Sequence, residues 1–163
     1  MNNIIIDELR NHPEYTSTIV EWLFSEWGNH NHSYWTSWVQ HSTQENDIPK
    51  TYVLFVNGHI VGTYSLWRCD LQSRQDLFPW FGGLYVDVAY RGKSYDGKKL
   101  GEILQRHAEL ELRKLGYQKA YLFTSHSPEY YNRNGWDYIC QAPDENDNLV
   151  NICSKFIFTK TEE

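Results

Sequence analysis

A basic segment with glycines is the first part of the sequence whose residue types and spacing suit chemistry. Residues 91–99 read RGKSYDGKK, with four cationic side chains and two glycines in nine positions. Glycine lets a backbone approach a ligand closely, and clustered cations attract an anion. The segment therefore predicts a site for a phosphate group, although a solvated basic loop would have the same composition.

The residues around this segment predict a strand before it and a helix after it. Residues 80–88 are rich in aromatic and β-branched side chains, which favours a strand, and from Gly97 onward the apolar residues follow helical spacing. A helix N-terminus has unpaired N–H groups and a partial positive charge, so cations are normally disfavoured there. Lys98 and Lys99 lie in or beside that first turn. Their placement favours an anion bound between the loop and the helix.

This strand, loop and helix resemble motif A of the GNAT superfamily, the acyl-CoA-dependent N-acetyltransferases. Residues 85–93, YVDVAYRGK, match the strand end and the first part of the loop, and residues 97–100 match the helix start. The resemblance implies acetyl-CoA as co-substrate, with its pantetheine arm pairing with the strand and its pyrophosphate lying on the loop. The implied cofactor-binding residues are Tyr85, Val86, Val88, Arg91, Gly92, Lys93, Ser94, Gly97, Lys98 and Lys99.

The second half of the loop departs from the motif. The motif has glycines three and five residues after the arginine, whereas this sequence has Ser94 and Asp96 there and Gly97 one residue later. We interpret the difference as a one-residue insertion. An alternative function therefore stays open, namely a non-catalytic acyl-CoA-binding or sensor domain with a degenerate pyrophosphate loop.

A second segment, residues 127–136, reads SPEYYNRNGW and resembles the A-x-x-F-Y-x-x-x-G-F segment of the same superfamily. It follows motif A at the family's usual distance. The resemblance implies that Tyr131 is the acid that protonates the leaving thiolate. The alternative is that Tyr131, like Tyr130, only packs against the following strand.

The acceptor site is predicted less sharply. The family builds its acceptor pocket from its first two helices, and aromatic faces attract ammonium groups, so Glu26, Trp27 and Trp35 are tentative substrate residues. His126, just before the tyrosine segment, is a fourth. Asp87, Glu26 and His126 are all alternatives for the general base, and none is chosen. The acidic and basic residues Asp70, Arg74 and Asp76 and the segment 77–80, all upstream of the central strand, are placed similarly but identify no substrate.

Composition excludes several other classes of function. The chain has 163 residues and a net charge of −6, which argues against a general nucleic-acid binder and suits a cationic partner such as an amine. No apolar run approaches membrane length, and the N-terminal apolar run is too short for a signal peptide. We expect the three cysteines to be reduced thiols of a cytoplasmic protein. His30 and His32 alternate but lack partners at metal-ligand spacing, so no metal is expected.

The expected fold is a single α/β domain over residues 1–163. It would be GNAT-like, with a mixed, mostly antiparallel sheet, a central parallel β-α-β crossover and flanking helices. The expected function is transfer of an acetyl group from acetyl-CoA to a primary amine of a small molecule, or to a peptide N-terminus. Direct attack in a ternary complex is expected, because no motif positions a nucleophilic cysteine. The oligomeric state is left open, with a homodimer as one possibility.

Overall fold

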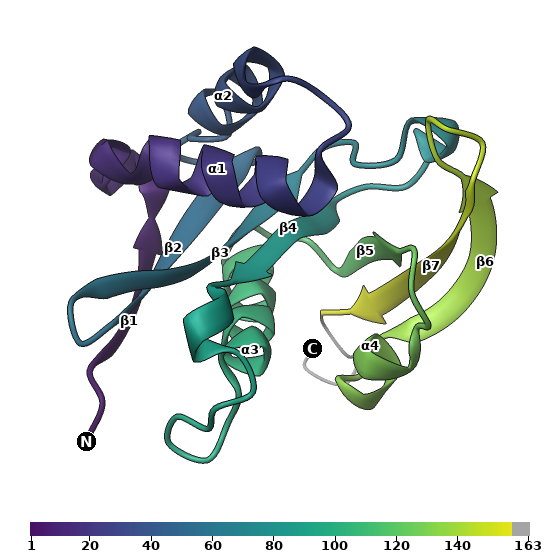
Figure 1. The fold of residues 1–163 in the computed structure, drawn as a ribbon. Coiled ribbons are helices and arrows are strands. Elements are labelled where there is room, and N and C mark those ends of the chain that lie inside the picture. Colours follow the sequence, from purple (N-terminus) through teal and green to yellow (C-terminus); the bar gives the residue numbers. More distant parts are fainter. Residues whose placement is uncertain (158–163) are drawn as a thin grey trace. The chain divides into compact units, whose positions relative to one another are not determined.

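The computed structural model describes residues 1–157, and its strands form one mixed sheet (Figure 1). The strand order is β1-β2-β3-β4-β5-β7-β6. β4 and β5 are parallel and are joined through α3, whereas β1–β2, β2–β3, β5–β7 and β6–β7 pair antiparallel. The predicted fold class, including the central crossover, is thus confirmed. The strands are β1 (Ile4–Glu8), β2 (Lys50–Val56), β3 (His59–Trp67), β4 (Trp80–Val86), β5 (Lys119–Thr124), β6 (Asp137–Pro143) and β7 (Leu149–Phe156), and the α-helices are α1 (Thr16–Trp27), α2 (His32–Gln40), α3 (Leu100–Lys114) and α4 (Glu129–Arg133).

Contacts between residues divide the chain into two compact units. The first contains Met1–Leu66 and Gly83–Ala108, and the second contains Trp67–Gly82 and the described residues from Glu109 onward. β4 and α3 each have residues in both units. The expectation of a single domain over residues 1–163 stays a prediction. No helix within residues 1–157 is both long enough and apolar enough to cross a membrane.

In the first unit, helices cover both faces of the strands β1 to β3 (Figure 1). α1 and α2 pack on one face, where their apolar residues meet alternate residues of β2. On the other face, α3 comes so close that a Cβ added to Gly62 of β3 would lie 3.3 Å from Cδ1 of Leu104. The strand β2 is therefore buried on both faces. The buried cluster beneath α1 and α2 consists of Leu9, Ile19, Val20, Leu23, Val39, Val53 and Phe55.

The central strand is shorter than the sequence predicts. β4 ends at Val86, and Val88 begins a 3₁₀ turn, Val88–Tyr90. Asp87 causes the change, because its side chain accepts a hydrogen bond from the Ala89 N–H at 2.9 Å and so caps that turn. The prediction that the strand extends through Val88 is wrong, and the Val88 side chain is largely exposed.

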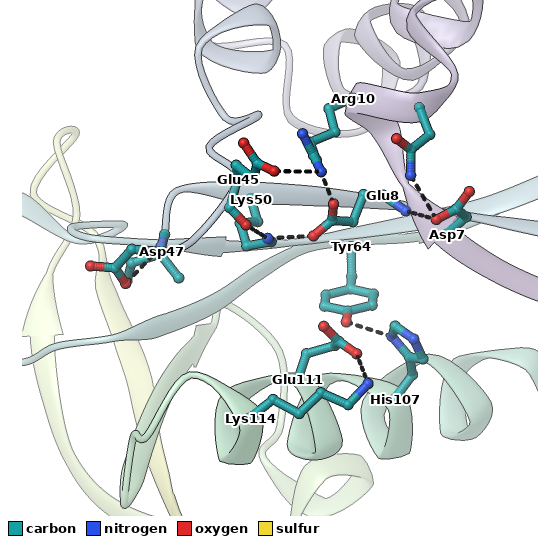
Figure 2. A network of polar contacts seen from close by, with 12 residues as sticks. Asp7, Glu8, Arg10, Glu45, Asp47, Lys50, Tyr64, His107, Glu111 and Lys114 are labelled. Carbon is teal, nitrogen blue, oxygen red and sulfur yellow. Dashed lines mark hydrogen bonds and ion pairs between the residues drawn. The ribbon is translucent and has the colours of Figure 1, made fainter.

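A network of ion pairs fixes one end of the first unit (Figure 2). Lys50 of β2 is only 4% exposed, and its ammonium group binds the carboxylate of Glu8 and donates to the carbonyl of Glu45 at 2.6 Å. Arg10 binds the same Glu8 carboxylate at 2.7 Å. Burial raises the pKa of Glu8, but the bonds to Lys50 and Arg10 outweigh burial and hold it below its ordinary value. The network thus stabilises the ionised glutamate.

We expect Lys50→Met to lower the free energy of unfolding by about 3 kcal/mol at pH 7, because it leaves a partly buried carboxylate without its main partner. A carboxyl with a lowered pKa stabilises the fold above its ordinary pKa and loses that contribution as the pH falls, so the deficit should shrink toward pH 3. Urea unfolding at both pH values measures this change.

Lys114→Met is the matched control, since the Lys114 ammonium group binds Glu111 at 2.8 Å from a side chain that is 73% exposed. It should change stability by no more than about 0.5 kcal/mol. Equal losses in the two variants would contradict the assigned role of Lys50.

Candidate functional site

The inserted residue of the basic loop is accommodated by a tight turn. Tyr95 and Lys98 exchange two backbone hydrogen bonds, at 2.7 and 3.0 Å, around Asp96 and Gly97. Both turn residues have positive φ, +50° and +81°, as in the two-residue hairpin turns that favour Asp-Gly. The buried ring of Tyr95 anchors this small hairpin. The extra residue therefore lies in a closed turn in front of the helix.

The helix after the loop begins at Leu100, three residues later than the sequence predicts. Lys98 and Lys99 therefore precede the first turn, and the acidic residue within it is Glu102. The Glu102 carboxylate accepts from the Lys99 N–H at 3.3 Å, while the Lys99 carbonyl accepts from the Glu102 N–H at 3.1 Å, as in a capping box. Lys99 also donates from its ammonium group to the Gly92 carbonyl at 3.1 Å. These bonds shape the loop and leave Lys93, Ser94 and Lys98 exposed.

Arg91 is held against the end of β4. Its Nε donates to the Val86 carbonyl at 2.6 Å, and its guanidinium lies 4.9 Å from the centre of the Tyr85 ring. The guanidinium is also 3.8 Å from a carboxylate oxygen of Glu26, and Trp22 stacks on Tyr85 at 5.1 Å. Arg91 thus ties the loop to the end of α1, and its side chain serves mainly to hold the loop in place.

The structure separates the tentative acceptor residues of the first unit. Glu26 lies beside the loop through Arg91, whereas Trp35 packs against the core under α1 and α2. The indole N–H of Trp35 is buried and has no hydrogen-bond partner among the described residues. Trp27, at the end of α1, is 40% exposed. Trp22, four residues before Glu26, lies on the same face of α1 as Glu26.

Tyr131 lies on α4 in the second unit. The N–H groups of Asn134 and Trp136 both donate to its carbonyl at 3.0 Å, which fixes the backbone after the helix. Its ring meets that of Tyr130 edge to face at 5.0 Å, and its hydroxyl has no hydrogen bond within residues 1–157. Burial, with smaller effects of Tyr130 and Cys153, raises the pKa of Tyr131 to about 12. The phenol therefore keeps its proton at neutral pH.

The neighbours of Tyr131 are rigidly held. Lys155 of β7 binds the carboxylate of Glu109 and donates to the Asn134 carbonyl at 2.8 Å. Trp136 is buried against Phe81, with ring centres 5.8 Å apart. By contrast His126, which follows β5, is exposed, and its ring has no recorded contact in the described part of the chain.

The cysteines Cys69, Cys140 and Cys153 are all free thiols. Cys153, on β7, is fully buried, and burial raises the pKa of its thiol to about 11. A thiol with so high a pKa holds its proton at neutral pH and is a poor nucleophile.

The two histidines considered for a metal make aromatic contacts. His30 stacks on Tyr34 at 3.7 Å, and His32 stacks on Phe24 at 3.9 Å and contacts Glu21 at 2.7 Å. Among residues 1–157, no group of three or more His, Cys, Asp or Glu side chains is arranged to hold a metal ion.

Asp70 is a partly buried acid to which neither sequence motif assigns a role. It lies just after β3, and its carboxylate packs against the backbone of β4 at Gly82. A Cβ added to Gly82 would lie 2.6 Å from Oδ2 of Asp70 and 2.7 Å from the ring of Trp67. Burial raises the pKa of Asp70 from 3.8 to about 7. No residue within 1–157 makes a hydrogen bond or ion pair with its carboxylate.

Comparison with known protein families identifies the fold and its chemistry. A family model described as the acetyltransferase (GNAT) family matches residues 13–136. The chain belongs to this family. Its class of chemistry is therefore acyl transfer.

Similar solved structures agree with this assignment at the level of the fold. An aminoglycoside 6'-N-acetyltransferase complexed with coenzyme A has a TM-score of 0.77 and 16% identity, over 97% of this chain and 99% of that one. An aminoglycoside 6'-N-acetyltransferase from Enterococcus faecium has a TM-score of 0.72 and 16% identity, with the same coverage of 97% and 99%. A putative acetyltransferase from Salmonella typhimurium with its cofactor acetyl-CoA has a TM-score of 0.69 and 15% identity, over 99% and 98%. A comparison with curated proteins gave no match.

We expect Arg91→Ala to weaken acetyl-CoA binding about tenfold, because it releases the loop from Val86, Tyr85 and Glu26. Calorimetric titration measures the dissociation constant. Arg106→Ala is the control, since it removes the same charge from an exposed position of α3. Unchanged affinity in the Arg91 variant would show that the loop does not depend on this anchor.

Asp70 should also make stability depend on pH. A carboxyl whose pKa is raised on folding favours the folded state below that pKa, and this contribution is lost as the pH rises toward 7. Asp70→Asn removes the effect, so wild type should lose more stability than the variant between pH 4.5 and 8. The difference should be at most about 4 kcal/mol. Asp76→Asn is the control, because Arg74 lowers the pKa of Asp76 and gives the opposite sign.

Proposed function

We propose that this GNAT protein is an N-acetyltransferase that moves an acetyl group from acetyl-CoA to a primary amine of a small molecule. The observation that carries the proposal is the pyrophosphate loop. Its extra residue is contained in the Asp96–Gly97 turn, so a glycine-containing basic loop still leads into the N-terminus of α3. Such a terminus provides backbone N–H groups and a favourable dipole for phosphate.

The residues of this chain can be given roles in holding acetyl-CoA. The backbone of β4 at Tyr85 and Val86 would pair with the pantetheine arm, as a strand added to the sheet. The exposed Lys93 and Lys98 would attract the phosphates, while Arg91 keeps the loop in shape. Val88, which lies beyond the strand, would contribute through the loop and not through strand pairing.

Tyr131 would supply the proton for the leaving thiolate. The acceptor nitrogen attacks the thioester carbon, and the C–S bond breaks as the tetrahedral intermediate collapses. A thiolate with a pKa near ~8.5 is a better leaving group when it is protonated as it departs. The partly buried phenol with an unengaged hydroxyl suits this step.

A small cationic amine suits the chain better than a peptide N-terminus. The protein has a net charge of −6, and Glu26, Trp22 and Tyr85 place an acid beside two stacked aromatic rings. Two of the similar structures are aminoglycoside 6'-N-acetyltransferases. Aminoglycosides are therefore the first acceptors to test, followed by simpler amines.

The second candidate function is a non-catalytic acyl-CoA-binding domain. The observation that favours it is the exposed Asp96, which places a negative charge in the predicted pyrophosphate loop. Calorimetric titration with acetyl-CoA, followed by an amine screen that detects released thiol, separates the two functions. Micromolar binding with thiol release supports the enzyme. Binding with no release from any amine supports the binding domain, and no binding at millimolar acetyl-CoA contradicts both.

We expect Tyr131→Phe to lower kcat about 100-fold and to leave the acetyl-CoA dissociation constant within about twofold, because the phenol acts on the leaving group. Tyr130→Phe is the matched control, since it removes the neighbouring hydroxyl from an exposed ring. Steady-state kinetics with the best amine of the screen measures both. If Tyr131→Phe keeps full turnover, the acid assignment is wrong.

A further inference from the structure

We propose that Asp70 is the general base of the transfer, and that its carboxylate receives the acceptor ammonium and takes a proton from it. This inference rests on the proposed function and adds to it the residue that selects a cationic acceptor. It assigns a role that neither sequence motif indicates, because Asp70 lies outside both.

The first argument is the place of the carboxylate. Asp70 occupies the space where any residue other than glycine at position 82 would put its Cβ. In the described chain the ladder between β4 and β5 consists of one pair, Trp80 with Tyr121. Gly82 lies two residues beyond that pair on the strand proposed to hold the pantetheine arm. The carboxylate therefore lies beside a part of β4 that no longer pairs with β5.

The second argument is the missing partner. Buried carboxylates are nearly always paired, because leaving one without a partner is costly. Oδ2 of Asp70 and the ring of Trp67 both lie against the backbone of Gly82, and neither Trp67 nor Gly82 carries a charge. The nearby cations lie elsewhere, since Arg68 is over the Phe78 ring and Arg74 binds Asp76 at 2.8 Å. A substrate ammonium would supply the missing positive charge.

The third argument is the proton affinity of the group. Burial is the sole cause that raises the pKa of Asp70 to about 7, and a base is most effective when its pKa lies near the working pH. Asp70 keeps part of its surface exposed, so its proton can pass on to water. The pKa of Tyr131, about 12, lies far from that of Asp70. Such separated values assign the base to Asp70 and the acid to Tyr131.

The proton balance closes without any further reactant. The ammonium gives one proton to Asp70, which later releases it to water, and the neutral amine attacks the thioester carbon. The thiolate sulfur takes the proton of Tyr131 as the C–S bond breaks. The nitrogen loses its second proton to solvent, and solvent returns one proton to Tyr131. The products are an amide, free CoA thiol and one released proton.

The other candidates for the base are engaged or exposed. The Asp87 carboxylate caps the 3₁₀ turn through the Ala89 N–H, and Glu26 lies beside the Arg91 guanidinium. His126 is exposed after β5. None of these three combines burial with a free carboxylate as Asp70 does.

The test compares Asp70→Asn with Asp76→Asn, which removes the same charge from the same segment. For Asp70→Asn we expect the acetyl-CoA dissociation constant to stay within about twofold, while kcat/KM for the acceptor at pH 7 falls about 100-fold. In wild type, kcat/KM should rise with a pKa near 7. In Asp70→Asn this rise should disappear. The value of kcat/KM should then increase only with the fraction of acceptor amine that is unprotonated, toward pH 9–10. Asp76→Asn should keep the wild-type profile.

The outcomes separate the two proposals. Wild-type activity with an unchanged pH profile in Asp70→Asn overturns the role of Asp70 and leaves the acetyltransferase function standing. A wild-type protein that binds no acetyl-CoA and acetylates no amine overturns the proposed function, and the role of Asp70 with it. Asp70→Ser, a smaller polar residue in the same space, should lose the same pH-dependent rise, and retention of that rise would also overturn the proposal.

Discussion

The short parallel contact between β4 and β5 is the constraint on which the second unit depends. Trp80 is fully buried, its indole N–H donates to the Leu77 carbonyl at 2.8 Å, and its ring contacts those of Tyr121 and Phe123. The Tyr121 N–H donates to the Pro79 carbonyl at 3.0 Å. The two strands thus pair at one place in the described chain. Beyond it, the backbone N–H and C=O groups on the facing edges of the strands need other hydrogen-bond partners. A bound pantetheine arm is one such partner.

Environment, more than residue type, decides which groups of this protein can react. A partly buried phenol without a hydrogen bond, a partly buried carboxylate without a counter-ion and a buried thiol all have raised pKa values, yet with different consequences. The phenol and the thiol keep their protons at neutral pH. The carboxylate is divided between its two forms there. The exposed carboxyl of Asp76, which is paired with Arg74, has a lowered pKa instead and remains ionised.

Local signals in the sequence predicted much of the fold. Asn57–Gly58, a dipeptide that favours two-residue hairpin turns, joins β2 to β3, and Gly28 ends α1 with a positive φ. The change of period after the loop identified α3. The end of β4 was missed because the side chain of one residue, Asp87, competes with strand pairing. The start of α3 was missed because Asp-Gly formed a turn of its own.

The candidate site was predictable only where it coincides with a motif. Tyr131 and the loop follow from their segments. Asp70 meets Gly82 across two strands, and Trp22 meets Tyr85 between a helix and a strand, and no spacing along the chain reports such contacts. A glycine required by another residue's side chain looks the same in a sequence as one required by a turn.

The small hairpin at Asp96 and Gly97 also separates the length of the loop from the orientation of the helix. One residue added inside a helix would turn every later side chain by about 100°, and one added inside a strand would exchange its two faces. A residue added at this turn does neither. Tyr95 and Lys98, which flank the turn, stay hydrogen-bonded to each other, so the chain leaves the turn beside the point where it entered. Loops of this kind can therefore change in length over evolution while the strand and helix beside them keep their register.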